Sequence, residues 1–150
     1  MISNVFQMPY MTRRLARLAE TGDREAQYRL GLSYLNGEGV PANGKLAQNW
    51  MNRAAHHGHQ LAWIEAGIMC AYGDTTLPGI QRDTGRAIAW FEKARKAGLP
   101  QGATHLAMLY MGGHGVEVNF RKAEQLLIEA EARGYLEAGM LLMGLWETTG

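Results

Sequence analysis

The chain has 150 residues, of which 47% are hydrophobic and 19% charged, and its formal net charge at pH 7 is +1. This composition is typical of one globular domain, because disordered chains are less apolar and a chain of this length buries about two thirds of its unfolded surface. The low net charge argues against a protein built to neutralise nucleic-acid phosphates or to coat an acidic membrane. The single cysteine, Cys70, excludes an intrachain disulfide and a zinc site made of several cysteines.

The first ten residues do not have the pattern of a secretory signal. They contain no Lys or Arg, polar residues and Pro9 interrupt their apolar residues, and Arg13 and Arg14 come afterwards. A signal has the opposite order and a longer apolar core. A lone cysteine also suits a reducing compartment. We therefore expect a cytoplasmic protein, without a membrane span because no run of eighteen apolar residues occurs.

The chain repeats itself with steps of 36, 40 and 36 residues. These steps relate the glycines Gly22, Gly58, Gly98 and Gly134, and also Tyr34, Cys70, Tyr110 and Trp146. Asn43, Asp83 and Asn119 follow the same register, as do Ala47, Ala87 and Ala123. The four extra residues of the longer step lie between Gly73 and Gly79. An insertion confined to one turn, with regular spacing on both sides, is typical of a helical repeat protein.

Each unit has the pattern of two antiparallel helices. Ala26, Leu30 and Tyr34 are four residues apart, which places them on one helix face. Asn and Asp at the 43, 83 and 119 positions are predicted N-caps, and the glycines at 58, 98 and 134 are predicted to follow helix ends. The pattern predicts no strands and helices over residues 9–21, 23–36, 43–57, 59–72, 83–97, 99–111, 119–133 and 135–147. In the first of these helices, Leu15, Leu18 and Ala19 are predicted to face inward.

The first unit shows the repeated pattern most fully. It contains Ala26, Leu30, Gly31, Tyr34, Gly37, Gly39 and Val40, followed by Asn43, Ala47, Trp50, Ala54, Ala55 and Gly58. This pattern resembles the Sel-one-like repeat family, which is related to the tetratricopeptide repeats. The resemblance implies an all-α, right-handed α/α superhelical solenoid of about three and a half helix-turn-helix repeats. One domain over 1–150 is expected, with a capping helix at 1–21, repeats at 22–57, 58–97 and 98–133, and a half repeat at 134–150.

The resemblance also implies a non-catalytic adaptor or scaffold that binds a protein or peptide, without a cofactor or a metal. In the related tetratricopeptide solenoids, the first helix of each repeat lines the concave face. That geometry gives a candidate binding surface of Tyr28, Leu32, Leu35, Ile64, Ile68, Tyr72, His105, Met108, Met111 and Met140. A groove with these side chains suits an apolar peptide or one face of a helix. The alternative is that the same side chains close the inner core of a short, tightly curved solenoid.

The segment after Gly134 is apolar on almost every side, whereas solenoids usually end in a polar cap. This predicts a homodimer through Leu141, Leu145 and Trp146. The alternative is that Met8, Tyr10 and neighbouring groups, or the curvature of the final helix, bury the segment. The insertion at 74–78 is either a second contact surface or a tolerated insertion.

The residues whose side chains could act in catalysis or metal binding do not indicate an enzymatic reaction. His56, His57 and His59 form a cluster with metal-binding potential, but no carboxylate or cysteine ligand recurs nearby at metal spacing. Cys70 occupies a column held elsewhere by aromatic residues, which predicts a buried structural thiol.

Two further functions stay open: an inhibitor or immunity-type protein, of the kind that small bacterial repeat proteins provide, and an RNA-binding helical repeat. The second needs a basic, polar inner face, which this sequence does not provide.

Overall fold

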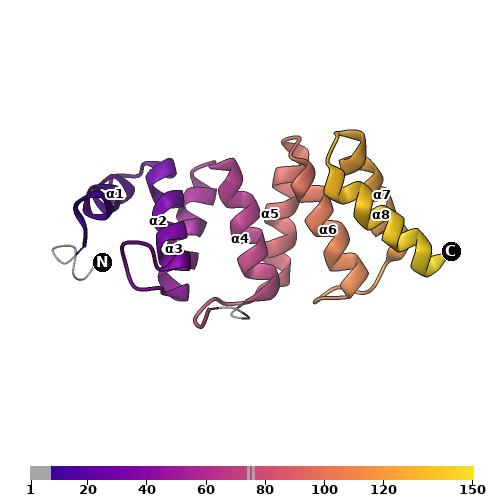
Figure 1. Cartoon of the computed structure of the whole chain (residues 1–150), viewed down its shortest axis with the longest axis horizontal. Helices are drawn as coiled ribbons and strands as arrows, with labels where there is room; N and C mark the ends of the chain where they lie inside the picture. Colours follow the sequence, from indigo (N-terminus) through magenta and orange to yellow (C-terminus); the bar gives the residue numbers. More distant parts are fainter. Residues whose placement is uncertain (1–7, 74, 76) are drawn as a thin grey trace. The chain divides into compact units, whose positions relative to one another are not determined.

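The computed structural model describes residues 8–73, 75 and 77–150, and within these ranges the chain forms eight helices and no strand. The helices are α1 (Tyr10–Glu20), α2 (Arg24–Asn36), α3 (Gly44–His56), α4 (Gln60–Tyr72), α5 (Thr84–Lys96), α6 (Pro100–Gly112), α7 (Phe120–Ala132) and α8 (Leu136–Thr149) (Figure 1). Every predicted helix is confirmed, with ends within two residues of those expected. The chain divides into two compact units, unit 1 (Met1–Arg82) and unit 2 (Asp83–Gly150).

Three of the helices begin at the predicted caps. The side-chain oxygens of Asn43, Asp83 and Asn119 each accept a hydrogen bond from the backbone N–H three residues later, at 3.0 Å. A free N–H of the first turn is thereby satisfied, which is why short polar residues start α3, α5 and α7. The same helices end just before Gly58, Gly98 and Gly134, whose φ angles of 83°, 87° and 80° are left-handed. Glycine adopts this conformation without the steric cost that other residues incur.

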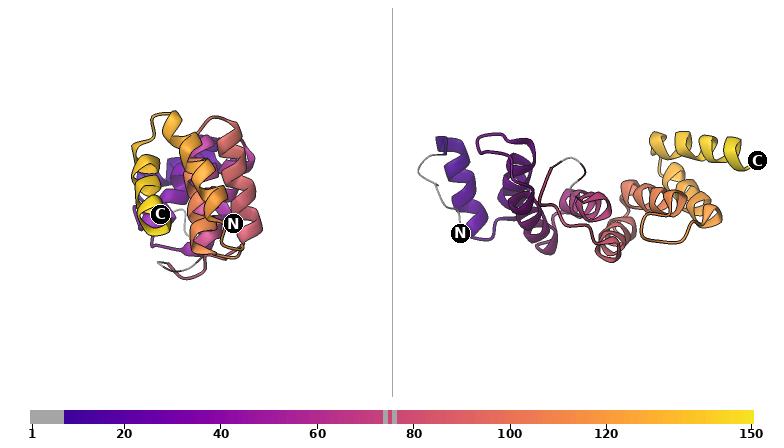
Figure 2. Two further views of the ribbon diagram at one scale, coloured as in Figure 1. Left: turned by 90° about the vertical axis from the view of Figure 1, so that its right-hand side faces the viewer. Right: turned by 90° about the horizontal axis from the view of Figure 1, so that it is seen from below.

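In unit 1, α2 packs against α3, and α1 and α4 pack against α2 and α3 respectively. Leu30 of α2 and Met51 of α3 are both 0% exposed, and the predicted burial of Cys70 is confirmed at 1%. The buried Gln27 ties three helices together, because its Nε2 donates to Ala19 O of α1 at 3.1 Å and its Oε1 lies 2.7 Å from His57 Nδ1 after α3. In unit 2, α6 packs between α5 and α7, and α8 packs on α7 (Figure 2). The core of this unit contains Phe91, Leu106, Leu109 and Leu127.

The orientation of α1 differs from the prediction at one residue. Ala16 and Ala19 are buried, whereas Leu18 is 45% exposed. Ala16 and Ala19 lie three residues apart on one face, and Leu18 is rotated by about 100° from Ala19 around the helix. Since α2 is the helix that covers α1 within unit 1, Leu18 faces solvent.

Candidate functional site

The predicted binding residues of unit 1 come from α2 and α4. Tyr28, Leu32 and Leu35 of α2 are half-buried, and so are Ile68 and Tyr72 of α4. Ile64 differs, because it is only 8% exposed and contributes to the core of unit 1 rather than to an open surface. We use the term α2–α4 surface for Tyr28, Leu32, Leu35, Leu61, Glu65, Ile68 and Tyr72.

Two members of this surface were missed by the sequence analysis. Leu61 is 52% exposed and lies seven residues before Ile68, so it occupies the same face of α4. Glu65 lies between them at helical spacing, and its half-buried carboxyl has a raised pKa because burial removes it from water. The helical spacing of residues 61, 65 and 68 is the signal in the sequence that places them on one face of α4.

His59 connects the two helices at the edge of the α2–α4 surface. Its Nδ1 accepts from Ala62 N at 3.2 Å and caps α4, while its Nε2 lies 2.8 Å from Glu25 Oε2. Its ring stacks on Tyr28 with the centroids 4.2 Å apart. The pKa of Glu25 is lowered, because its carboxylate is hydrogen-bonded to His59 and to Arg29. Burial, with the charges of Glu65 and Glu25, raises the pKa of Tyr28.

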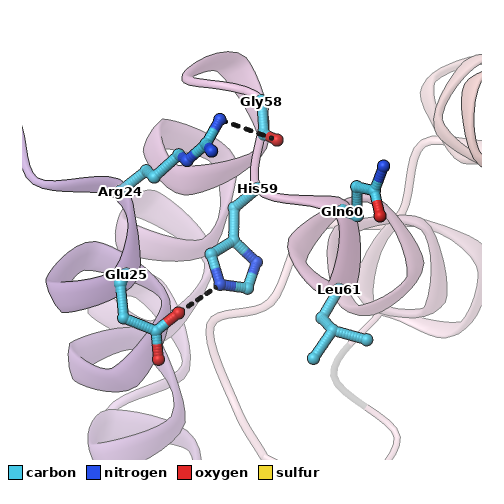
Figure 3. A pocket seen from close by; sticks show the side chains of 6 residues that line it. All are labelled: Arg24, Glu25, Gly58, His59, Gln60 and Leu61. Carbon is cyan, nitrogen blue, oxygen red and sulfur yellow. Dashed lines mark hydrogen bonds and ion pairs between the residues drawn. The ribbon is translucent and has the colours of Figure 1, made fainter.

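A hollow of about 410 Å³ lies beside this histidine. It is lined by Arg24, Glu25, Gly58, His59, Gln60 and Leu61. Figure 3 shows the side chains of Glu25 and His59 directed toward one another across one wall, with Arg24 reaching the carbonyl oxygen of Gly58. Arg24 Nη1 donates to the carbonyl oxygens of Gly58 and His57, both at 3.4 Å, and the guanidinium has further N–H donors for another group.

The histidine cluster 56–59 is dispersed rather than gathered. His57 pairs with Gln27 and His59 with Glu25, in different directions. Across the described residues, no three His, Cys, Asp or Glu side chains come close enough to hold a metal ion. The structure therefore uses two of these histidines to join helices.

In unit 2, the predicted binding residues are half-buried like those of α2, except for one. His105, Met108 and Met111 of α6 are half-buried, and Met140 of α8 is 66% exposed. His105 stacks on Phe91 with centroids 5.1 Å apart, and its buried Nδ1 has no hydrogen-bond partner within the described part of the chain. Burial lowers the pKa of His105, and the charge of Glu137 opposes this effect.

The residues predicted to form a dimer lie on different sides of α8. Leu145 is 3% exposed and belongs to the core of unit 2, Leu141 is half-buried, and Trp146 is 51% exposed. Trp146 Nε1 donates to Glu124 Oε1 at 2.5 Å. Leu145 faces inward because it continues the buried stripe of Ala138 and Leu142 at helical spacing.

The insertion is only partly described. Asp74 and Thr76 lie outside the described residues, and Leu77, Pro78 and Gly79 border a hollow of about 440 Å³ together with residues 42–45. The buried Gln48 holds the following segment, since its amide donates to Gln81 O and accepts from Gln81 N, both at 2.9 Å.

The helices, with their polar N-caps and the glycines that follow their ends, recur at regular intervals along the chain, so this is an all-α repeat protein. The Sel1 repeat family matches residues 24–59, 62–99 and 100–135, and the chain belongs to this family. Sel1 repeat proteins are generally protein-interaction scaffolds and typically non-catalytic.

The solved structures that resemble the chain include two Sel1-type repeat proteins. A Sel1 repeat protein from Oxalobacter formigenes is 32% identical with a TM-score of 0.68, and the match covers 87% of this chain and 96% of that one. The protein c5321, a protective antigen of uropathogenic Escherichia coli strains with an SLR fold, is 29% identical with a TM-score of 0.74. That match covers 85% of this chain and 26% of c5321, so the chain spans about a quarter of c5321. No helix in the described ranges has the length and apolar character needed to cross a bilayer.

Proposed function

We propose that the chain is a non-catalytic, cytoplasmic adaptor that holds an amphipathic segment of a protein partner against the α2–α4 surface. The observation that carries the proposal is a row of half-buried apolar side chains next to a desolvated carboxylate. Apolar groups at this degree of exposure gain contacts when an apolar helix face or peptide covers them.

Glu65 indicates the charge of the partner. Burial leaves the Glu65 carboxylate poorly solvated and raises its pKa, and no ion pair offsets this effect within the described residues. A Lys or Arg from the partner would restore a favourable environment for the charged form. The proposed partner segment therefore carries one basic residue beside its apolar face.

The test starts with peptides selected on the immobilised chain from a displayed library of amphipathic sequences. Leu61→Glu and Ile68→Glu are expected to weaken binding of the selected peptides by about tenfold or more, because a charge enters the apolar contact. Ile128→Glu on α7 is the matched control, since Ile128 is 46% exposed and Leu61 52%. The control is expected to bind as the wild type does.

Two readouts separate docking from structure. Leu61→Glu is expected to leave the melting temperature nearly unchanged, because the side chain is already largely exposed. Glu65→Gln is expected to weaken the binding of basic peptides and to leave the binding of uncharged peptides unchanged. Selected peptides that bind Leu61→Glu and Ile68→Glu with unchanged affinity would contradict the proposal.

A further inference from the structure

The helices α1 and α8 each expose apolar side chains on one face. On α8 these are Leu136, Met140, Met143 and Trp146, which are 78%, 66%, 62% and 51% exposed and which we name the α8 face. On α1 they are Tyr10, Met11 and Leu18, at 70%, 68% and 45%, which we name the α1 face. In Figure 2, α1 (indigo) has α2 on one side, and α8 (yellow) has α7 on one side.

Within the α8 face, Met143 occupies a position that α2 and α6 turn toward the second helix of their own repeat. Met143 lies in the same repeat column as Gly31 of α2 and Ala107 of α6. A Cβ added at Gly31 would lie 3.2 Å from Met51 N and 3.4 Å from Ala47 O, so this position of α2 touches the backbone of α3. Ala107 is 0% exposed in α6, which packs on α7.

The α1 face is the counterpart of this surface. Met11 lies in the repeat column of Ala47 of α3 and Ala123 of α7, and both alanines are 0% exposed. Ala47 is the residue whose carbonyl oxygen approaches Gly31. The column of Leu18 contains Ala54 and Ala130, which are also 0% exposed. The Met11 position of the α1 face is therefore one that a second helix turns toward the first helix of its repeat.

Charge adds to this complementarity. The helix α1 carries Arg13, Arg14 and Arg17 against the single acidic residue Glu20. The helix α8 carries Glu137 and Glu147 and contains no Lys, Arg or His. A positive helix and a negative helix attract one another when their apolar faces meet.

We propose that the α8 face of one copy of this chain packs on the α1 face of a second copy. The pairing reproduces between two molecules the contact that α2 makes with α3 and α6 with α7 within one chain. Met143 and Met11 replace glycine and alanine at the centre, and methionine is flexible enough to adjust to a wider helix spacing. The contact is heterologous, because two different surfaces meet, so one copy of a pair keeps a free α1 face, the other keeps a free α8 face, and further copies can add.

The interface consists of one helix pair, and it buries less surface than the roughly 1,600 Å² that a stable protein complex buries. We therefore expect weak association, with a dissociation constant on the order of 100 μM. Sedimentation equilibrium of the chain between about 10 μM and about 1 mM is expected to show a mass that rises with concentration above the monomer's 16.6 kDa.

Two variants block one end each. Met11→Glu removes the α1 face and Met143→Glu the α8 face, and both side chains are more than 60% exposed, so the fold is expected to be kept, as far-ultraviolet circular dichroism would show. Each variant alone is expected to stay at 16.6 kDa, whereas their equimolar mixture forms a one-to-one complex that grows no further. Ile128→Glu is expected to associate like the wild type.

The mixing experiment separates this proposal from its rivals. If α8 faces paired with one another, Met11→Glu alone would still dimerise, and this result would overturn the proposal. A wild-type chain that remains monomeric up to about 1 mM would also overturn it. No peptide partner is present in the experiment, so its outcome is independent of the proposed adaptor function.

Discussion

His59 illustrates how single side chains join the repeats. Because its Nδ1 accepts from Ala62 N, this nitrogen carries no proton, and Nε2 donates to Glu25. The residue that caps α4 thus also binds the first turn of α2, 34 positions earlier in the chain. The sequence indicated a histidine cluster at a helix end, but its partners could not be predicted, since they depend on how α2 and α4 are placed in space.

At the same scale, His105 is expected to make unit 2 sensitive to acid. Its folded pKa lies below the ordinary 6.5 because of burial. As the pH falls below about 6.5, the unfolded chain takes up a proton first, so the folded state loses stability until the pH reaches the folded pKa. His105→Phe keeps a ring against Phe91 and removes the titration. The fall in melting temperature between about pH 7.5 and about pH 5 is expected to be smaller in this variant.

Glu137→Gln provides the opposite change. The charge of Glu137 raises the pKa of His105, so its removal lowers that pKa further and is expected to enlarge the loss of stability in acid. Identical pH profiles of the wild type and His105→Phe would show that His105 does not titrate in this way.

At the scale of elements, the sequence predicted the helices well because their ends are encoded locally. Asn43, Asp83 and Asn119 act as caps through bonds that span three residues, and the glycines after the helices act through their own backbone. The outward faces of α1 and α8 were harder to predict. Leu18 and Leu145 lie in apolar segments, and the sequence of such a segment does not show which side a neighbouring helix covers. Leu18 was expected to be buried and Leu145 to be exposed, and the structure shows the reverse.

At the same scale, the two hydrogen bonds between the Gln48 side chain and the Gln81 backbone, here called the Gln48 clamp, hold the segment after the insertion against α3. Gln48→Leu removes both hydrogen bonds and is expected to reduce the free energy of unfolding by about 1–2 kcal/mol. Gln125→Leu, at an exposed position of α7, is the control and is expected to stay within about 0.5 kcal/mol of the wild type. Urea unfolding measures both, and equal stabilities of the two variants would contradict the clamp.

At the scale of the whole molecule, the sequence predicted the family and the all-α repeat fold, and its candidate binding residues overlap only in part with the proposed surface. Tyr28, Leu32 and Ile68 are accessible as expected, while Ile64 is buried and Leu61 and Glu65 emerged only from the structure. Burial and desolvation depend on contacts between helices far apart in sequence, which the repeat columns do not contain. The proposed adaptor role therefore depends on a surface that three-dimensional packing defines.

The most direct measurement is a nuclear magnetic resonance titration of the labelled chain with a selected basic, amphipathic peptide. We expect the largest shifts at Leu32, Leu61, Glu65 and Ile68, and only small shifts elsewhere in the chain. Saturating binding with shifts confined to α5–α8 would contradict the assignment of the partner surface to α2 and α4.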